Sequence, residues 1–506
     1  MSQNRSRPWF PAVAAALASL LLYAVTLGAA YNIYDDGFLV SGPDIRVRNP
    51  HLWGQFWKND FFHGGIDNLY RPLASQSFGL QWWLTGNRPW PFHLVNILLS
   101  AGVCAAVAEL GRRLAGWRAG LIAGLLFAVH PVHVEAVTSI VGRTELLCAL
   151  GLISALVIFL RPPLTLSRAI AITALGLMAM LSKEPGMLLP VLLIGALPVR
   201  GPLAKSERTA AKWLAVLVLW SVSALIILRE QILGLKFEWD RSFLDWTIQP
   251  LIHSPPADRW LIPIALVGRY ARLLIFPTHL SIDYGAAIIN PTIPRDDPYL
   301  WFGVFCLIAA GVTAIVLLRK KNWPALFCLF AAAITYAMAS NIIIIGTIFG
   351  ERLIYLPSAF LLILAAMVLA RLPAKLAATI LTFLLLLGFA RSYTYAIQWH
   401  DRDSFYAYSL RHQPNSARLH LLLAEVDRQE GRLDDARSLL LDGRRMLPDY
   451  WQFWYDGGLV EEDAKNWPEA SADFQRAFDL HPSNALEDRV SHAQRMMLQA
   501  ATRGSN

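Results

Sequence analysis

Long apolar segments recur along most of this chain and constrain its fold more than any other feature. A helix needs ~20 predominantly apolar residues to span a hydrocarbon core. The first segment, Trp9 to Ala30, meets this length and the others approach it, so the sequence predicts an all-α, polytopic helical membrane protein of about 11–12 spans. The further apolar runs lie at about 92–111, 119–135, 145–160, 169–182, 185–199, 212–228, 259–277, 299–318, 323–345, 352–370 and 376–391.

The composition agrees with a membrane protein and divides the chain into two parts. Charged residues make up only 16% of the chain, against ~25% in soluble domains. Residues 399–506 carry 13 Lys and Arg against 18 Asp and Glu, net −5, whereas residues 1–398 carry 32 against 19, net +13. The basic residues of the first part lie mostly in short loops, where they orient spans and give no argument for nucleic acid. We expect a transmembrane domain at 1–398 and a soluble helical domain at 399–506.

Charges that flank the first apolar run predict its orientation. Arg5 and Arg7 precede the run, and Asp35 and Asp36 follow it. Positive residues favour the cytoplasmic side, so we expect the amino terminus in the cytoplasm and the first loop, at 31–90, on the exported side. A cleaved signal peptide is the alternative interpretation, because small residues end the run.

One later apolar run conflicts with the expected alternation of successive loops between the two sides of the membrane. Basic clusters between the runs should face the cytoplasm, but the last two do so only if one intervening run does not cross. The run at 259–277 is the candidate, because Arg269 and Arg272 share one helix face and Pro263 and Pro277 bracket it. Eleven crossings place the carboxyl-terminal domain on the exported side, and twelve place it in the cytoplasm.

Prolines recur at a fixed interval beyond Trp399. Pro414, Pro448 and Pro482 are 34 residues apart, which is the period of tetratricopeptide repeats. We therefore predict two full repeats over about 417–484, preceded by a partial one. Small and large residues recur in the pattern that interlocking helix pairs require. The matching positions are Ala436 and Ala470, Leu440 and Phe474, Ala424 and Gly458, and His420 and Trp454.

Two adjacent carboxylates, Asp35 and Asp36, stand at the membrane face just past the first run. A carboxylate near an active site can take the proton from an attacking hydroxyl. Polar residues that merely end a helix would look the same, and the residues alone leave both interpretations open. The exported loop is rich in aromatic residues such as Tyr70, which suit either the water–lipid boundary or a cleft that stacks on sugar rings.

A polar stretch follows the third apolar run. Two histidines and a glutamate, His130, His133 and Glu135, could in principle bind a metal. Pro131 prevents a regular helix from presenting them at ligand spacing, and no further cluster of ligands appears in the sequence. We therefore expect no metal, and we expect the two histidines to cap the exported end of a span.

Further charged residues interrupt the apolar runs, and charges at membrane depth usually face a cavity or a partner. Arg143 and Glu145 lie at the mouth of the fourth run and could hold a sugar or a phosphate. Lys183 and its neighbour Glu184 are predicted to form an ion pair, with a plain polar hairpin as the alternative. Arg352 starts a late span, where it could grip a phosphate with two hydrogen bonds or be a snorkelling surface residue.

An ordered set of motifs runs through the chain. The motifs are Tyr34-Asp35-Asp36, Tyr70-Arg71-Pro72-Leu73, Phe92-His93-Leu94-Val95-Asn96, Phe127-Ala128-Val129-His130-Pro131, Glu135-Ala136-Val137, Gly142-Arg143, Ser182-Lys183-Glu184 and Glu351-Arg352-Leu353-Ile354-Tyr355-Leu356-Pro357-Ser358. Together they resemble the transmembrane-and-tetratricopeptide O-mannosyltransferases, a family of GT-C-type glycosyltransferases. The resemblance covers nearly the whole chain. The family usually has many repeats, however, and this chain has about two and a half.

The resemblance implies a reaction and a site. In characterised members a sugar, mannose, passes from a polyprenyl- or dolichyl-phosphate donor to a protein Ser or Thr hydroxyl, with no cofactor besides this lipid-linked co-substrate. Residues 1–398 would then be the catalytic domain. The expected site comprises Asp35 and Asp36 as catalytic residues, Arg352, Arg269, Arg272 and Lys183 as ligands of the donor phosphate and lipid, and Tyr70, Arg71, His130, His133, Arg143, Glu145, Glu351 and Tyr355 as substrate contacts.

The expected partners are the lipid-linked sugar, membrane lipid and an acceptor polypeptide bound through the repeats. The expected location is a bacterial inner membrane with the site and repeats on the periplasmic side, or the endoplasmic reticulum membrane in a eukaryote. A transporter or flippase of polyprenyl-linked glycans is an alternative, but it should carry charges along the middle of several spans. A membrane scaffold that recruits partners through its repeats is another, although an anchor needs only one span.

Overall fold

The computed structural model describes residues 8–31, 36, 39–40, 45–62, 69–234 and 245–504. Every regular element in these ranges is a helix and none is a strand, which confirms the predicted all-α class. The chain divides into two compact units. The first unit contains Met1–Leu244, Pro255–Leu280 and Thr292–Arg402, and the second contains Asp245–Ser254, Ser281–Pro291 and Asp403–Asn506.

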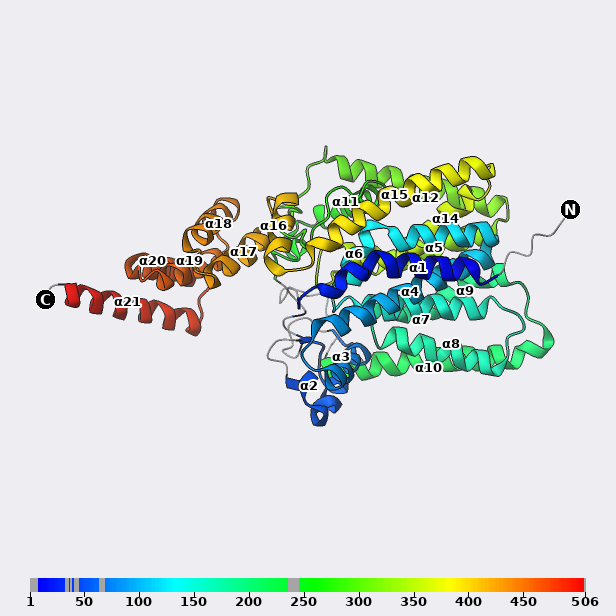
Figure 1. Ribbon diagram of the computed structural model, residues 1–506, viewed down its shortest axis with the longest axis horizontal. Coiled ribbons are helices and arrows are strands. Elements are labelled where there is room, and N and C mark those ends of the chain that lie inside the picture. The colour runs from blue at the N-terminus through cyan, green and yellow to red at the C-terminus, as the bar shows by residue number, and fades with distance from the viewer. Residues whose placement is uncertain are drawn as a thin grey trace. The chain divides into compact units, whose positions relative to one another are not determined.

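The long helices of the first unit run side by side (Figure 1). In chain order its elements are α1 (Phe10–Tyr23), η1 (Ala24–Gly28), α2 (Ile45–Arg48), η3 (Pro50–Trp57), α3 (Pro72–Thr85), α4 (Pro89–Ala115), α5 (Trp117–Val129), η4 (Pro131–His133), α6 (Val134–Thr138), α7 (Arg143–Phe159), α8 (Leu166–Met180), η5 (Glu184–Leu188), α9 (Leu189–Arg200), η6 (Lys205–Glu207), α10 (Arg208–Leu233), α11 (Asp258–Ile275), α12 (Pro298–Arg319), α13 (Trp323–Ala337), η8 (Glu351–Ile354), α14 (Tyr355–Leu369) and α15 (Ala374–Gln398).

The lengths of these helices support an integral membrane protein. Among the described residues, six segments are long and apolar enough to cross a membrane: Phe10–Gly28, Pro89–Ala115, Lys205–Leu233, Pro298–Arg319, Glu351–Leu369 and Ala374–Gln398. A seventh forms if α5 and the Pro131–Thr138 segment, which meet at 58°, act as one broken span. Helices α7, α8, α9 and α13 have only 17, 15, 12 and 15 residues, short of ~20. By length, the structure has fewer full spans than the sequence predicted.

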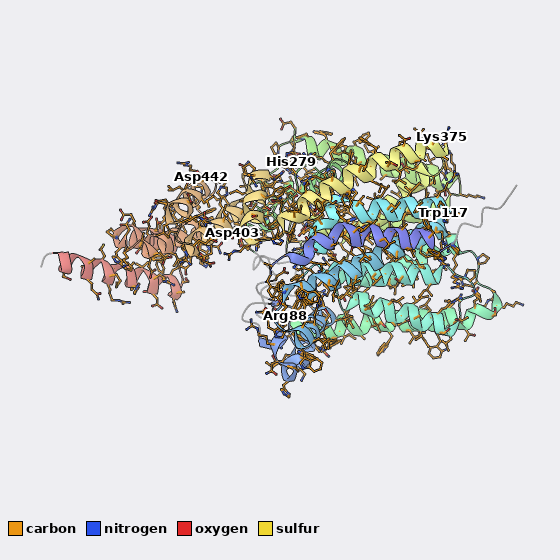
Figure 2. The ribbon with its side chains drawn as sticks, viewed as in Figure 1. Arg88, Trp117, His279, Lys375, Asp403 and Asp442 are labelled. Atoms are coloured by element: carbon orange, nitrogen blue, oxygen red, sulfur yellow. The ribbon has the colours of Figure 1, made fainter. Side chains whose placement is uncertain are left out.

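The two ends of the first unit differ in character. Figure 2 places Trp117 and Lys375 at one end and Arg88 at the other. At the first end, Arg200 closes α9, and its Nε donates to the Phe159 carbonyl at the end of α7 (2.9 Å). We call the end with Trp117 and Lys375 the basic end. The end with Arg88 is called the site end. Basic residues near the helix termini of the basic end are Arg112, Arg113, Arg161, Arg168, Arg200, Lys205, Arg208, Arg319, Lys320, Lys321, Arg371 and Lys375.

Helix α11 has both of its termini at the site end. Near its start, Arg259 Nη2 donates to the Ile342 carbonyl (2.8 Å), and near its end the Tyr270 hydroxyl donates to the Gly350 carbonyl (3.2 Å). Both acceptors lie in the segment that joins α13 to α14. Both ends of α11 therefore lie at the same end of the unit, in agreement with the expectation that the 259–277 run does not cross.

The second unit repeats a pair of helices. Its elements are η7 (Pro250–His253), α16 (Arg402–His412), α17 (Ala417–Gln429), α18 (Leu433–Met446), α19 (Trp451–Asp463), α20 (Trp467–Leu480) and α21 (Asn484–Gly504). The bounds of α19 and α20 are those of α17 and α18 moved by 34 residues, which is the proline period of the sequence. Gly458 makes room for its partner helix, because a Cβ at this position would lie 2.6 Å from the Phe474 ring.

Two earlier segments of the chain complete the second unit. Asp283 accepts a hydrogen bond from the Ser416 hydroxyl at the start of α17 (2.7 Å), and burial raises the pKa of this carboxyl. The Trp246 ring packs on Tyr450, with 5.5 Å between the ring centroids. The compact unit therefore differs from the contiguous 399–506 stretch that the sequence suggested, because it also contains residues 245–254 and 281–291.

Candidate active site

Asp36 is buried at the site end, with 1% of its surface exposed. Its carboxylate accepts hydrogen bonds from the backbone N–H groups of Ile140 (3.3 Å) and Val141 (3.0 Å), just before α7. Such donors stabilise the charged carboxylate. Burial and the nearby charge of Asp36 raise the pKa of the Tyr31 phenol. Asp35 lies outside the described residues.

Arg143, the first residue of α7, is 1% exposed and binds other protein groups. Its Nε and Nη atoms donate to Asn96 Oδ1 (3.0 Å), Ser77 Oγ (3.3 Å), Gln81 Oε1 (2.6 Å) and the Phe92 carbonyl (3.2 Å). The Phe78 ring covers the guanidinium at 4.7 Å. The side chain therefore joins α3 and α4 to α7, whereas the sequence had placed it against a sugar or phosphate.

Three ion pairs lie at the site end, in addition to the Ile140–Val141 turn that binds Asp36. They are Lys183 with Glu145, Arg352 with Glu135, and Arg71 with Glu184. Arg71 binds its partner through Nε and Nη2 (3.2 and 2.8 Å), the bidentate geometry that favours arginine over lysine. The predicted ion pair between Lys183 and its neighbour Glu184 is wrong, because each of the two binds a partner from another element.

These pairs form one electrostatic cluster. Glu135 interacts with Lys183 and Glu145 as well as with Arg352, and Glu184 interacts with Arg229 of α10 as well as with Arg71. Burial alone would raise the pKa of Glu184, but its basic neighbours lower it to about 2. We call this set the charge cluster: Arg71, Glu135, Glu145, Lys183, Glu184, Arg229 and Arg352. The cluster gathers arginine and lysine side chains, which attract anions, at the site end.

Arg352 is the most accessible member of the three ion pairs. Its side chain is 29% exposed, against 2% for Glu135. Its Nη1 lies 3.2 Å from Glu135 Oε1, and its backbone N–H donates to Glu135 Oε2 (2.8 Å). The buried carboxylate therefore orients a guanidinium that stays partly exposed.

Breaking the pair of Lys183 and Glu145 is expected to destabilise the first unit strongly. The two side chains are 9% and 6% exposed, and removing one partner of a buried pair costs about 3–5 kcal/mol because the other charge stays uncompensated. We expect Lys183→Met to lower the melting temperature in detergent and Lys183→Met with Glu145→Gln to recover much of it. The control is Asp442→Asn, which removes an exposed pair worth about 0–1 kcal/mol. An unchanged melting temperature for the single variant would contradict this prediction.

Both predicted capping histidines contact backbone carbonyls. His130 Nε2 donates to the Leu274 carbonyl (3.0 Å) and its Nδ1 accepts from the Val132 N–H (3.4 Å). His133 Nδ1 donates to the Phe127 carbonyl at the end of α5 (2.7 Å). These contacts agree with the capping interpretation. No group of three or more potential metal ligands occurs among the described residues.

Two further predicted substrate contacts, Tyr355 and Glu351, are fully buried. The Tyr355 ring meets His133 edge-on, with ring centroids 4.8 Å apart. His133 Nε2 also lies 2.8 Å from the hydroxyl of Ser358, one turn along α14. These side chains join the α5 break to the start of α14. The structure therefore places Tyr355 and Glu351 in the interior of the unit rather than on an open surface.

In their described contacts, the two arginines of α11 meet residues outside the Arg352 segment. Arg269 lies over the Tyr299 ring at 4.4 Å, and Arg272 Nη2 lies 3.2 Å from His279 Nδ1. The α11 residue that reaches the Arg352 segment is Tyr270, which exchanges hydrogen bonds with Gly350 (3.2 and 3.3 Å). Help from Arg269 or Arg272 in binding a phosphate stays a prediction.

Tyr70 belongs to the packing of the first loop. It is 4% exposed, and its hydroxyl donates to the Trp57 carbonyl (3.1 Å). Burial raises its pKa to about 12. Its neighbour Arg71 immediately precedes α3 and belongs to the charge cluster, so of these two adjacent predicted contacts only the arginine reaches the ion pairs.

Sequence reasoning gave no role to three residues that organise this site: Asn96, Arg229 and Tyr270. Each stands within or at the edge of an apolar run, and a polar group there needs a partner. That signal was available for Asn96, which the family motif also contains, and for Arg229. For Tyr270 there was none, because a tyrosine in an amphipathic helix has many ordinary positions.

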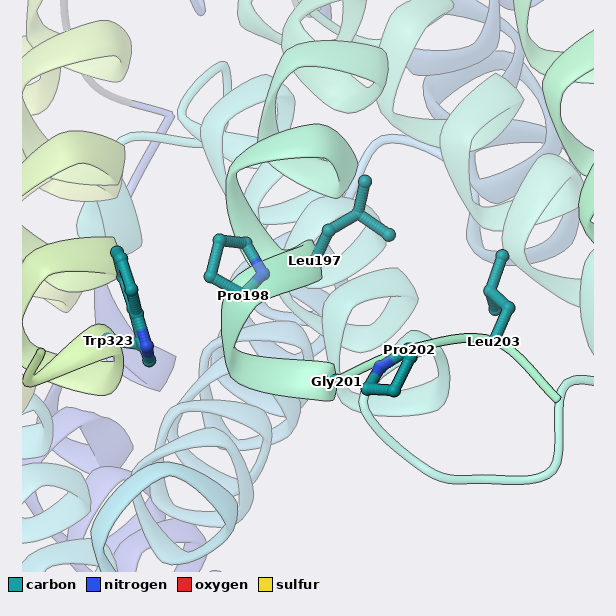
Figure 3. A pocket seen from close by; sticks show the side chains of 6 residues that line it. All are labelled: Leu197, Pro198, Gly201, Pro202, Leu203 and Trp323. Atoms are coloured by element: carbon teal, nitrogen blue, oxygen red, sulfur yellow. The ribbon is translucent and has the colours of Figure 1, made fainter.

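Figure 3 shows an apolar recess between the carboxyl end of α9 and the start of α13. Its volume is about 510 Å³, and it is lined by Leu197, Pro198, Gly201, Pro202, Leu203 and Trp323. Helix α9 separates it from Glu184, and at 1.5 Å per residue the 12 residues of α9 span about 18 Å. The recess therefore belongs to the opposite face of the membrane unit from Asp36.

Solved structures and protein families give limited information. The crystal structure of the Archaeoglobus fulgidus oligosaccharyltransferase in the apo form is 14% identical, covers 79% of this chain and 56% of its own, and has a TM-score of 0.42. ArnT from Cupriavidus metallidurans, bound to undecaprenyl phosphate, is 13% identical, covers 93% of this chain and 80% of its own, and has a TM-score of 0.41. At these TM-scores the likeness carries no argument. No protein-family model matches the chain.

Sequence relatives are more informative. Protein O-mannosyl-transferase F38B6.6 of Caenorhabditis elegans is 26% identical over 86% of this chain, and protein O-mannosyl-transferase TMTC3 of Mus musculus is 26% identical over 89%. Protein O-mannosyl-transferase tmtc2 of Xenopus laevis is 42% identical over 25% of this chain and 16% of its own. The homologues of this chain are TMTC-family protein O-mannosyl-transferases. The chain spans 62% and 52% of the lengths of the first two O-mannosyl-transferases.

Proposed function

We propose that this protein is a membrane glycosyltransferase that moves a sugar from a polyprenyl-phosphate donor to a Ser or Thr hydroxyl of a polypeptide. One observation carries the proposal. Buried Asp36 and the charge cluster both involve one short segment, Ile140 to Glu145, at one end of a membrane unit. The homologues are protein O-mannosyl-transferases, so mannose is the first sugar to test.

The proposed chemistry balances with these groups alone. The acceptor hydroxyl oxygen attacks the anomeric carbon of the sugar, and the bond from that carbon to the phosphate oxygen breaks. The hydroxyl proton passes to a carboxylate, for which Asp36 and Asp35 are the candidates, as general base. The electron pair of the broken bond stays on the leaving polyprenyl phosphate, and a fixed guanidinium stabilises the charge that develops there.

The position of the charges favours an enzyme over a flippase of lipid-linked glycans. A flippase should carry ionisable residues along the middle of several spans. In the part of the chain that the structure describes, Glu135, Glu145, Lys183 and Arg352 all stand at or between helix ends. This arrangement concentrates charge at one surface of the membrane unit, where a sugar phosphate and a hydroxyl can meet.

The second unit is the proposed platform for the acceptor polypeptide. Repeated helix pairs present surfaces suited to extended peptides. Aromatic side chains are available on α19: the Trp451 ring stacks on His481 with centroids 4.8 Å apart, and Arg444 lies 4.2 Å over the Trp454 ring. The net −5 charge of residues 399–506 fits poorly with docking on an anionic cytoplasmic leaflet, which supports an exported location.

A donor panel tests the proposed function directly. Purified full-length protein in nanodiscs is incubated with polyprenyl-phosphate mannose, glucose or arabinose, each with a radiolabelled sugar, and with a Ser/Thr-rich acceptor protein. We expect label in the acceptor from one donor, released by β-elimination as an O-linked sugar. The proposal fails if no donor labels the acceptor while polyprenyl phosphate is also not released.

Labelling from outside the cell is expected to reach the second unit. Asp434 is 97% exposed, so a cysteine there should react with a membrane-impermeant maleimide in intact spheroplasts. Lys320→Cys at the basic end should react only after lysis. The native cysteines give little background, because three are buried and Cys306 lies in α12. Labelling of Asp434→Cys only after lysis would place the second unit in the cytoplasm and remove the platform proposal.

A further inference from the structure

The turn that binds Asp36 is itself held by one buried side chain, Asn96 of α4. Asn96 Nδ2 lies within hydrogen-bond distance of the carbonyls of Ser139 (2.8 Å) and Ile140 (3.2 Å) and reaches that of Val137 (3.5 Å). The same turn directs its N–H groups to the Asp36 carboxylate. The Asn96 amide thus binds the carbonyl groups of this turn, and the Asp36 carboxylate binds its N–H groups.

Asn96 is in turn oriented by Arg143. An amide side chain can present either its oxygen or its nitrogen to a given partner. Arg143 Nε donates to Asn96 Oδ1 (3.0 Å), which leaves Nδ2 facing the turn. Gln81 holds the far side of the guanidinium at 2.6 Å. The chain of contacts therefore runs from α3 through Arg143 and Asn96 to the turn and ends on Asp36.

The turn is closely packed at Gly142. A Cβ on Gly142 would lie 2.2 Å from the Ala136 carbonyl oxygen and 2.9 Å from that of Ser139. The backbone donors of Ile140 and Val141 are thus packed in place before any substrate arrives, as a preorganised site requires.

We propose that Arg143 and Asn96 are positioning residues for Asp36. They fix the two backbone donors that set where the carboxylate lies, and they do not themselves touch sugar or phosphate. The inference rests on the proposed function of Asp36 as a base, and it replaces the sequence-based assignment of Arg143 to substrate. Burial supports the replacement, because Asn96 and Arg143 are 0% and 1% exposed.

Hydrogen exchange tests the positioning without any assay of activity. Asn96→Asp keeps the shape and an acceptor for Arg143 but turns the donor that faces the carbonyls into a second acceptor. We expect exchange of the amides in peptides covering 137–142 to accelerate by about tenfold or more, since this variant loses the hydrogen bonds from Asn96 to the turn. Unchanged protection in Asn96→Asp would overturn the proposal.

The kinetics of a conservative variant distinguish the positioning of Asp36 from the binding of the donor. Arg143→Lys keeps the charge near Asp36 but cannot reach all four acceptors. We expect kcat per folded enzyme to fall by on the order of 10- to 100-fold, as for other small misplacements of catalytic groups, with the donor KM within about twofold of the wild type. A rise in donor KM at unchanged kcat would make Arg143 a ligand contact and overturn the proposal.

A matched control is available at the other end of the same unit. Arg200 is likewise buried, lies 5.4 Å from the Phe159 ring and donates to the Phe159 carbonyl. Arg200→Lys should affect stability but not kcat per folded enzyme. An equal loss of kcat in Arg200→Lys and Arg143→Lys would reduce Arg143 to a structural role. If the wild type transfers no sugar, the proposed function fails, and the exchange experiment still decides whether these residues hold Asp36.

Discussion

Asp36→Asn is expected to reduce sugar transfer by about 10²- to 10⁴-fold, the range that a general base contributes. The amide has almost the same shape, so it can stay in the site that Ile140 and Val141 form. It cannot accept the proton of the acceptor hydroxyl. The measurement is initial rate with the labelled donor at saturating acceptor. Asp35→Asn, made separately, shows which of the two adjacent acids is the base, and the double variant should be inactive.

The control for Asp36→Asn is a carboxylate with similar contacts and no place in the proposed chemistry. Asp297 Oδ1 accepts from the backbone N–H groups of Tyr299 (2.8 Å) and Leu300 (3.0 Å) at the start of α12. Asparagine caps helices about as well as aspartate, so Asp297→Asn should keep near-wild-type turnover. Wild-type turnover in both Asp35→Asn and Asp36→Asn, and in the double variant, would exclude the acidic pair as the base.

Arg352→Ala is expected to lower kcat/KM for the lipid-linked donor by about 10²- to 10³-fold, the usual loss when one stabilising donor of a transition state is removed. Arg352 is the partly exposed member of its ion pair, with 29% of its side chain accessible, and its guanidinium can approach a phosphate. Arg352→Lys should recover little, because an ammonium lacks the planar fork that binds two oxygens. Donor titrations of kcat and KM for both variants provide the measurement.

The loss of Arg352 also leaves Glu135 buried without its partner, and this effect must be separated from lost binding. Arg352→Ala with Glu135→Gln removes the orphaned charge, so it should regain stability without regaining activity. Arg295→Ala is the surface control, because Arg295 is 61% exposed and its pair with Asp258 is worth little. Recovery of wild-type kcat/KM in the double variant would show that Arg352 supports the fold and does not bind the donor.

Several features of this protein follow from local sequence patterns. Apolar runs predict buried or membrane helices because a backbone in lipid must satisfy its own hydrogen bonds. The 34-residue proline period sets the helix bounds of the second unit, where α17 starts at Ala417 and α19 at Trp451. The two arginines and two prolines of the 259–277 run marked the helix whose two ends lie at the same end of the unit. All of these patterns act over one or two helices.

The site was only partly predictable, because its contacts join distant positions. Motif residues Glu135 and Arg352 were both recognised, but their pairing bridges 217 positions. Lys183 and Glu184 were expected to bind each other as neighbours in sequence, yet each points to another helix. Asn96 carries no sequence signal for its contacts with the turn before α7, because a polar residue in an apolar run indicates only that some partner exists.

The sequence alone determined the all-α membrane class, the repeat period and the list of polar residues at the helix ends, since each depends on hydrophobicity and spacing along the chain. Only the tertiary structure decided which of those residues meet. It showed that Arg143, a predicted ligand contact, is buried and binds other protein groups. It also showed that 245–254 and 281–291 belong to the second unit and that Asp36 accepts hydrogen bonds from two backbone N–H groups. The physical reason is that hydrogen bonds and ion pairs are satisfied by whatever group packing brings within about 3 Å, and packing is a property of the whole fold.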